Sequence, residues 1–413
     1  MRTATKILRQ LLNITNAFVE EILLEEHLLI VHVRPRRSRP RCGQCGRRAP
    51  GYDRLPLRYW RHLSLGRWVI QLAYEPRRVD CRTCGVRSEQ VPWGDSRSRF
   101  TWEFEEMVAY LAQVTDKARV TKLMGISWPT VGRIVDRVVA RRLDPARLLG
   151  LERIGVDEFS YRKRHRYVTI VVDHDRRRVV WACDGHSAEA LTAFFDELGP
   201  ERSSRIREVT IDMSAAYLKA IEERIPHATV IFDRFHVQRL ASDAVDEVRR
   251  SMVREIDDAE EARAIKGTRF SLLKNPWDLT RVERTRLSEL QRKNRPLYRA
   301  YLLKETLARA LDYVQPKRAT DALRDWLAWA SRSKLKPFVK AARTVRKHFD
   351  GIVAYVNSRL TNGFTEGINN KLRMVARRAF GFHSPQALIA MLFLTSGGIQ
   401  LDPPLPGIDP QER

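Results

Sequence analysis

The sequence has little cysteine, few turn-forming residues and no long apolar run. Five cysteines in 413 residues are too few for a disulfide scaffold. Twenty glycines and 19 prolines are too few for a collagen-like or low-complexity chain. The 43% of hydrophobic residues can form a large core, which excludes global disorder. The length predicts roughly two to three domains.

No segment has the length and apolar character of a membrane span. The longest uncharged stretch, Gly381–Leu401, is interrupted by Pro385 and Gly397. Its apolar centre, Ala387–Leu394, is well short of the ~20 residues that a spanning helix needs. We expect a buried helix there. The N-terminus leads into no apolar region of the secretory type, so we expect a soluble, cytoplasmic protein.

Acidic residues are also few in proportion to basic ones. The chain has 75 Lys and Arg against 50 Asp and Glu, a formal net charge of +25. This excess favours a polyanionic partner, most commonly DNA or RNA, and the alternative is a merely solubilising surface. Seven basic residues without an acid occur between Arg34 and Arg48, and again between Arg332 and Lys347.

The apolar pattern changes twice along the chain. Up to about residue 100 it predicts two hairpins, Val19–Leu23 with Leu28–Val33 and Leu57–Leu65 with Trp68–Tyr74. From about Trp102 to Leu143 the spacing is helical.

Beyond residue 150 the pattern predicts a mixed α/β sheet covered by helices, in the order β-β-β-α-β-α-β. The expected elements are strands at Ile154–Phe159, Tyr167–Val172, Val179–Cys183, Val209–Ile211 and Thr229–Phe232, and helices at Ala188–Leu198 and Ala215–Arg224. Phe235 to about Tyr355 is expected to be almost wholly helical, and a further helix is expected over Phe364–Ala379.

Four of the five cysteines form two Cys-x2-Cys pairs, Cys42 with Cys45 and Cys81 with Cys84. Each pair predicts a tight turn whose thiolates approach one metal, and four thiolates complete a tetrahedral, structural zinc site. The alternative is two unrelated reduced pairs. A redox pair would need a thioredoxin-like βαβ context, which is absent. Cys183 ends an apolar strand and is expected in the core.

Residues 118–135 have the pattern of a helix-turn-helix. Gly125 ends a short helix, Ser127 can cap the next one, and Pro129 is tolerated in its first turn. The residues expected to pack between the helices are Val120, Leu123, Ile126, Val131 and Ile134.

The second of these helices would present its N-terminal side chains to the major groove of DNA. Trp128, Thr130 and Arg133 are the residues so placed, with Arg137 and Arg141 near phosphates. An ordinary helical hairpin within a core is the alternative.

Three carboxylates could act together. Asp157 lies on the first expected strand of the α/β region, and Asp212 follows the fourth. If these strands are parallel neighbours, both carboxylates come to one end of the sheet. Glu366 lies near the start of the late helix. An Asp at a strand end is equally often a simple cap, and the competing acids are Glu158, Asp173, Asp184 and Asp233. Because adjacent strand residues point to opposite faces, only one of Asp157 and Glu158 can join the cluster.

Clustered carboxylates suit Mg²⁺, a hard cation. Three of them repel one another and would hold a proton unless a divalent cation joined them. Two Mg²⁺ ions about 4 Å apart could activate a water or a 3′-hydroxyl in phosphodiester displacement. On the late helix Phe364, Ile368, Leu372, Val375 and Ala379 share a face expected to pack on the sheet. A second stripe, Glu366, Asn370, Arg373 and Arg377, would face DNA.

In these motifs the chain resembles the bacterial insertion-sequence transposases of the DDE type, in particular the ISL3 group. The resemblance covers nearly the whole chain and is most specific at Asp233-Arg-Phe-His236 and at Thr361-Asn-Gly-x-x-Glu-Gly-x-Asn-x-Lys371. It implies a ribonuclease H-like core with a helical insertion before the third acid. It also implies Asp157, Asp212 and Glu366 as the metal-binding triad, in preference to Glu158 and Asp233. For Asp233 and His236 we expect a supporting or DNA-positioning role.

The expected protein is a DNA transposase that binds terminal inverted repeats and performs Mg²⁺-dependent strand cleavage and strand transfer, with Mn²⁺ as a substitute and Zn²⁺ as a structural ion. We expect a zinc-binding module at 1–100, a helix-turn-helix at 101–148, the catalytic core at 149–238 and 356–400, and a helical insertion at 239–355. Double-stranded DNA, both repeat ends and target, is the expected partner, with no membrane. A homodimer or larger assembly would act in the bacterial cytoplasm, in association with the nucleoid. The alternatives are a non-catalytic DNA-binding regulator and a ribonuclease or resolvase with the same core.

Overall fold

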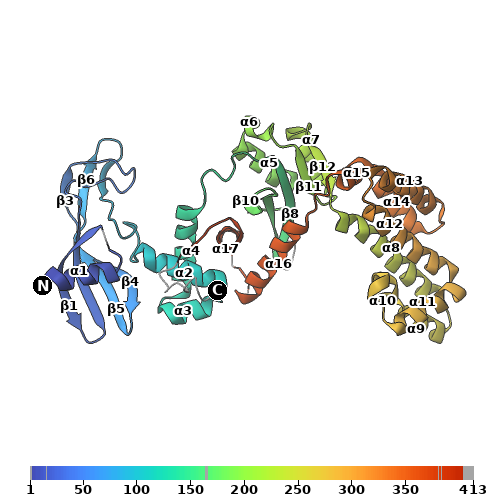
Figure 1. Cartoon of the computed structure of the whole chain (residues 1–413), viewed down its shortest axis with the longest axis horizontal. Helices are drawn as coiled ribbons and strands as arrows, with labels where there is room; N and C mark the ends of the chain where they lie inside the picture. The colour runs from blue at the N-terminus through green and yellow to red at the C-terminus, as the bar shows by residue number, and fades with distance from the viewer. Residues whose placement is uncertain (1, 15, 163–165, 380, 383, 403–413) are drawn as a thin grey trace. The chain divides into compact units, whose positions relative to one another are not determined.

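The computed structural model describes residues 2–14, 16–162, 166–379, 381–382 and 384–402. Its elements are labelled in Figure 1. The chain divides into two compact units. Unit 1 runs to Leu143 and includes short pieces near the C-terminus, and unit 2 runs from Asp144 to Arg377 and includes residues 381–389.

A four-stranded sheet opens unit 1, with the strand order β1-β2-β5-β4. Its strands are β1 (Ala17–Glu25), β2 (Leu28–Pro35), β4 (Arg58–Leu65) and β5 (Trp68–Tyr74). Both predicted hairpins are confirmed, because β1 pairs with β2 and β4 pairs with β5, each antiparallel. A helix, α1 (Arg2–Leu11), precedes the sheet and was not predicted.

A smaller sheet in the same unit carries two of the cysteines. It consists of β3 (Gly51–Arg54), β6 (Arg77–Cys81) and β7 (Gly85–Ser88), in the order β3-β6-β7. Cys81 is the last residue of β6, and Cys84 lies in the turn that leads into β7. The β6–β7 hairpin therefore fixes the second cysteine pair on a rigid turn.

Unit 1 continues with α2 (Trp102–Val114), α3 (Lys117–Met124) and α4 (Trp128–Arg142). Gly125 adopts a left-handed conformation (φ 58°) at the end of α3, a geometry that glycine accepts without strain. Val120, Val131 and Ile134 are fully buried between the helices, as expected. Leu123 is not, because 67% of its surface is exposed. Its side chain points about 60° away from that of the buried Val120 around the helix axis. Because α3 ends one residue later, at Met124, no further helical turn covers it.

Unit 2 begins with a five-stranded sheet in the order β10-β9-β8-β11-β12. Its strands are β8 (Arg153–Arg162), β9 (Arg166–Asp173), β10 (Arg178–Asp184), β11 (Glu208–Ile211) and β12 (Thr229–Phe232). Strand β9 pairs antiparallel with both β8 and β10, and β11 runs parallel to β8 and to β12. With α5 (Ala188–Leu198), α6 (Pro200–Ser203) and α7 (Ala215–Arg224), this confirms the predicted mixed α/β order.

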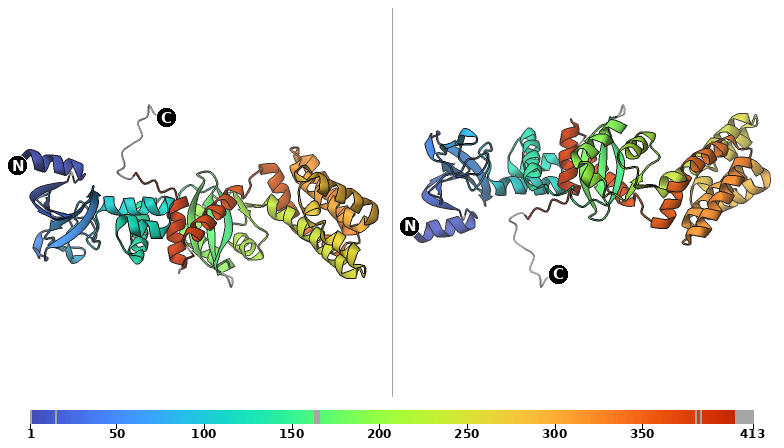
Figure 2. Two further views of the ribbon diagram at one scale, coloured as in Figure 1. Left: turned by 90° about the horizontal axis from the view of Figure 1, so that it is seen from below. Right: turned by 90° about the horizontal axis from the view of Figure 1, so that it is seen from above.

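A group of helices follows β12 and lies together in both views of Figure 2. These elements are α8 (Arg234–Glu255), α9 (Ala259–Lys266), α10 (Arg269–Leu273), a 3-10 turn (Pro276–Asp278), α11 (Arg281–Lys293), α12 (Arg295–Asp312), α13 (Pro316–Arg332), α14 (Lys336–Lys347) and α15 (Phe349–Ser358). The expectation of an almost wholly helical segment is confirmed.

Two further helices follow within the described residues, α16 (Gly363–Arg378) and α17 (Pro385–Ser396). Leu388, Leu392 and Leu394 of α17 are buried, which confirms the expected buried helix. No helix among the described residues has the length and apolar character needed to span a bilayer.

Candidate active site and metal centre

Strand register brings Asp157 and Asp212 to neighbouring positions. The parallel ladder between β8 and β11 pairs Gly155 with Thr210. Asp157 lies two residues further along β8, and Asp212 directly follows the end of β11 at Ile211. The two carboxylates are close enough for the charge of Asp212 to raise the pKa of Asp157. Because side chains alternate along a strand, Asp157 lies on the same face of the sheet as Gly155. The prediction that these two aspartates meet depended on β8 and β11 being parallel neighbours, and the structure fulfils that condition.

Helix α16 covers that face and contacts Asp157 directly. Asn369 Nδ2 donates a hydrogen bond of 2.8 Å to Asp157 Oδ2, while the backbone N–H of Glu158 donates to Oδ1. Burial raises the pKa of Asp157 to about 6, and the negative charge of Asp212 acts in the same direction. A cation beside this pair would relieve both effects.

Glu366 is the exposed member of the predicted triad. It lies in the first turn of α16, three residues before Asn369, so the two side chains are neighbours on the helix surface. The exposed row predicted for α16 is present, since Glu366, Asn370, Arg373 and Arg377 are all exposed. The opposite face packs inward through Ile368, Leu372 and Val375, with Phe364 and Ala379 half-buried.

The structure does not gather the three carboxylates into a closed cluster. In the described part of the chain, one group of three or more Cys, His, Asp or Glu side chains has ligand atoms within 4.8 Å of one another, and it is the cysteine group described below. The two aspartates therefore form a pair on the sheet, with Glu366 presented from the covering helix.

A buried polar network fixes the start of α16 against the sheet. Thr210 Oγ1 donates to Asn362 Oδ1 at 2.6 Å, and His174 Nε2 is hydrogen-bonded to Thr210 Oγ1 at 2.7 Å. Gly155 leaves the room for this network, because a Cβ there would lie 2.8 Å from His174 Nε2. Sequence reasoning missed Asn362 and Asn369. The available signal for Asn369 was a polar residue beside Ile368 and Leu372 on the apolar side of the late helix.

Asp233 and His236 belong to the same region. Asp233 is 3% exposed and follows β12, and the backbone N–H of Asn362 donates to its Oδ1 at 3.4 Å. His236 Nδ1 lies 3.2 Å from Asp233 Oδ2, and this contact raises the pKa of His236. Asp233 thus contacts Asn362, the residue directly before α16. The supporting or DNA-positioning role expected for it stays a prediction.

The four cysteines converge in the small sheet of unit 1. The sulfurs of Cys42, Cys45, Cys81 and Cys84 all lie within 4.8 Å of one another. Cys45 Sγ and Cys81 Sγ are 3.6 Å apart. Zn–S bonds of about 2.3 Å in a tetrahedron put sulfurs about 3.8 Å apart, so the spacing fits zinc.

The surroundings of the sulfurs also favour a cation. Backbone N–H groups of Thr83 and Cys84 point to Cys81 Sγ and lower the pKa of that thiol to about 7. Burial and the neighbouring thiols raise the pKa of Cys84. Crowded thiolates of this kind repel one another in the absence of a metal, and four of them complete the coordination shell without an open position.

The helix-turn-helix is fastened to the β-sheet of unit 1. Arg61 from β4 donates to the Gly125 carbonyl at 2.8 Å, within the turn between α3 and α4. His62 Nδ1 is hydrogen-bonded at 2.8 Å to Thr101 Oγ1, the N-cap of α2. Burial lowers the pKa of His62 to about 4. The turn is therefore held by the sheet as well as by its own helices.

The predicted DNA-contacting residues of α4 have different surroundings. Arg133 is exposed and its Nη2 donates to Thr130 Oγ1 at 3.2 Å. The Ser127 hydroxyl bonds to the Thr130 hydroxyl rather than to the helix backbone. Trp128 is half-buried, with the Lys117 ammonium 4.9 Å from its ring centroid.

Arg137 has a protein partner of its own. Its Nε donates to Glu105 Oε1 at 2.8 Å, and the Glu105 side chain on α2 is fully buried. Arg141 contacts the other oxygen of Glu105 at 3.1 Å, and Ser98 Oγ donates to Oε1. Arg137 and Arg141 thus join α4 to α2, a contact that sequence reasoning did not anticipate.

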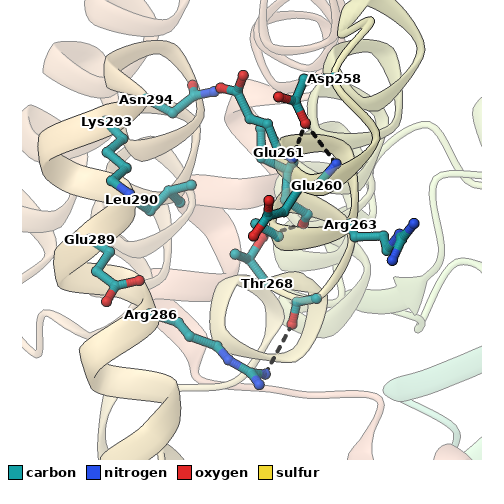
Figure 3. Close-up of a pocket in the computed structure, with 13 residues that line it drawn as sticks. Asp258, Glu260, Glu261, Arg263, Thr268, Arg286, Glu289, Leu290, Lys293 and Asn294 are labelled. Atoms are coloured by element: carbon teal, nitrogen blue, oxygen red, sulfur yellow. Dashed lines mark hydrogen bonds between the residues drawn. The ribbon is translucent and has the colours of Figure 1, made fainter.

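A hollow of about 550 Å³ in the helical part of unit 2 contains none of the predicted site residues (Figure 3). Its charged lining combines both signs, and it contains Asp258, Glu260, Glu261 and Glu289 together with Arg263, Arg286 and Lys293. A balanced lining of this kind favours neither an anion nor a cation.

Comparison with known proteins places these features in one class, the transposases. Residues 154–392 match a family model described as "Transposase", and residues 89–139 match the helix-turn-helix domain of transposase family ISL3. The chain is 39% identical to the transposase for insertion sequence element IS1557 of two Mycobacterium tuberculosis strains, over 97% of each chain. It is 31% identical to the transposase for insertion sequence element IS1001 of Bordetella parapertussis, over 87% of this chain and 89% of that one. The chain belongs to the ISL3 family of transposases, which confirms the resemblance seen in the sequence.

Proposed function

We propose that this protein binds the terminal inverted repeats of an insertion sequence, cleaves DNA there in a Mg²⁺-dependent reaction and transfers the freed strand ends to target DNA. The observation that carries the proposal is the proximity of Asp157 and Asp212 at the neighbouring strands β8 and β11. Helix α16 contacts Asp157 through Asn369 and carries Glu366 in its first turn. The sheet order, three antiparallel strands followed by two parallel ones, supports a ribonuclease H-like core.

Asp157, Asp212 and Glu366 would hold the metal ions. Mg²⁺, or Mn²⁺ in its place, would supply activation of the attacking oxygen and stabilisation of the leaving oxygen. The protein's own part begins with Asn369 and the Glu158 N–H, which fix the two oxygens of Asp157. Asn362 fixes the start of α16 against β11, and Glu366 stands in the first turn of that helix.

DNA recognition is assigned to both units. On α4, Trp128, Thr130 and Arg133 would meet the major groove of DNA. Arg137 would lie near the phosphates while its guanidinium keeps the hydrogen bond to Glu105. On α16, Asn370, Arg373 and Arg377 would meet DNA beside the carboxylates. The zinc held by the four cysteines would stabilise the module that carries the Arg-rich segment Arg34–Arg48.

We also propose the division into a zinc module (1–100), a helix-turn-helix (101–148), a catalytic core (149–238 and 356–400) and a helical insertion (239–355). Two element ends must be processed together, so the active complex would contain at least two copies of the chain, acting on nucleoid DNA.

Cleavage of supercoiled DNA that carries the element's ends tests the proposal. The sequence of those ends is available from the DNA flanking the gene. In Mg²⁺ the native protein should nick at the ends, whereas Asp157→Ala and Glu366→Ala should bind the ends but leave them intact. Met374→Ala, an exposed position on the same helix, is the matched control and should cleave normally.

A non-catalytic regulator is the second candidate, favoured by the helix-turn-helix alone. It predicts end binding without any Mg²⁺-dependent nick. Preference for RNA or branched DNA over repeat ends would instead indicate a ribonuclease or resolvase. Cleavage by both alanine variants would refute the assignment of the site.

A further inference from the structure

Helix α14 carries a row of exposed basic side chains. The row consists of Lys336, Lys340, Arg343 and Lys347, here called the α14 row. At 100° per residue these four positions fall within an arc of about 60° on the helix surface. All four side chains belong to exposed residues. Their spacing gives a straight line of cations about 16 Å long, at a rise of about 1.5 Å per residue.

The opposite side of α14 is anchored in the core. Phe338, Ala341, Ala342 and Val345 are buried there, and α14 packs against α8, α13 and α15. The α14 row is therefore presented to solvent by a helix that is fixed on its other side. A rigid row of this kind loses little backbone freedom when it meets a ligand.

The α14 row also lacks acidic partners. Within the described part of the chain, the side chains of its four members form no ion pair and no hydrogen bond, and the one side-chain hydrogen bond to this row reaches the backbone carbonyl of Lys340, from Thr344 Oγ1. Some other exposed basic residues of unit 2 are paired with acids, for example Arg224 with Asp196 at 2.7 Å and Arg250 with Asp246 at 3.1 Å. The sequence from Arg332 to Lys347 contains no acid at all.

We propose that the α14 row binds the phosphate backbone of duplex DNA, as a contact separate from the helix-turn-helix and from the carboxylate site. Each DNA strand presents one phosphate about every 3.4 Å along the duplex axis, so a 16 Å row spans about five phosphates of one strand. The contact reads no bases and positions the duplex. The inference rests on the proposed function, because it takes DNA as the substrate.

The salt dependence of DNA binding tests the inference. For the native full-length protein without Mg²⁺, the logarithm of the binding constant should fall linearly with the logarithm of salt concentration. The variant K336A/K340A/R343A/K347A should reduce the slope by about 3 to 4, since each phosphate contact contributes about 0.9. The variant should lose the same DNA affinity on an end-bearing duplex as on a scrambled duplex of equal length, because phosphate contacts do not depend on the base sequence.

A charge-matched control separates a specific contact from net charge. The variant R205A/R224A/R239A/R250A also removes four positive charges, but from arginines that are exposed and paired with acids. Its slope should stay close to that of the native protein. Equal slopes for the two variants, or an unchanged slope for the α14 variant, would overturn the inference. If the native protein binds no duplex DNA at all, the proposed function itself is refuted, and this result is distinct from an unchanged slope in the α14 variant.

Discussion

Arg137 offers a sharp test of how the helix-turn-helix is built. Sequence reasoning assigns it to DNA, whereas the structure gives it a bond to Glu105, whose side chain is fully buried. Replacing Arg137 by Ala removes two contacts to Oε1, at 2.8 and 2.6 Å. Glu105 keeps its contacts with Arg141 and Ser98, so its charge is not left wholly unpaired.

The loss of stability expected for Arg137→Ala follows from these contacts. A hydrogen bond to a charged group contributes about 1.5–3 kcal/mol, so Arg137→Ala should destabilise the α2–α4 pair by about 2 kcal/mol. In the full-length protein, backbone amides of these helices should then exchange with solvent about 30-fold faster, since every 1.4 kcal/mol is a factor of ten. Hydrogen-exchange mass spectrometry on peptides within 102–142 measures this.

Arg133→Ala is the matched control. Arg133 lies one turn earlier on α4, is exposed and has no acidic partner among the described residues. Its removal should change stability by less than about 0.5 kcal/mol but weaken binding to the element's ends by about tenfold. The reasoning fails if Arg137→Ala leaves amide exchange within about threefold of the native rate while it weakens DNA binding.

Three further predictions concern the metal sites and pH. Removing the zinc with a chelator, or replacing Cys45 in Cys45→Ser, should loosen the small sheet of unit 1. Faster exchange of the backbone amides in that sheet measures this effect. A metal analysis that finds no zinc in the purified protein would contradict the zinc site. Because the pKa of His62 is about 4 in the folded protein and about 6.5 when unfolded, unit 1 should be most stable above pH 6.5 and lose up to about 3 kcal/mol as the pH falls to 4. Urea unfolding across that range checks this, and His62→Gln should flatten the profile. Asn369→Ala should raise the Mg²⁺ concentration for half-maximal cleavage by about tenfold or more without weakening DNA binding. An unchanged metal requirement would show that Asn369 does not position Asp157.

Sequence patterns predicted the elements of this protein well where a single periodicity dominates. The hairpins of unit 1, the β-β-β-α-β-α-β order and the helical segment after β12 all have regular apolar spacing. Helix α1 has apolar residues at Ala4, Ile7, Leu8 and Leu11, the spacing of an amphipathic helix, so the sequence signal was present and was overlooked. Leu123 was misplaced because its burial depends on the length of α3 and not on its spacing from Val120.

The site was predictable only in part, for a physical reason. Carboxylates and cysteines are recognisable by residue type and spacing. Asn362 and Asn369 matter because they meet β11 and β8 across more than 150 positions of sequence, a contact that only the folded sheet creates. The bond between Glu105 and Arg137 likewise depends on how α2 crosses α4, which charge patterns along the chain do not reveal.

Strand cleavage at the element's ends tests the central claim most directly. Supercoiled DNA carrying the flanking inverted repeats, incubated with native protein and Mg²⁺, should acquire nicks that map to the repeat termini. Asp157→Ala should bind the same ends and produce none. Cuts by Asp157→Ala at the native rate, or binding without any cut by the native protein, would contradict the assignment of the carboxylate pair as the reaction centre.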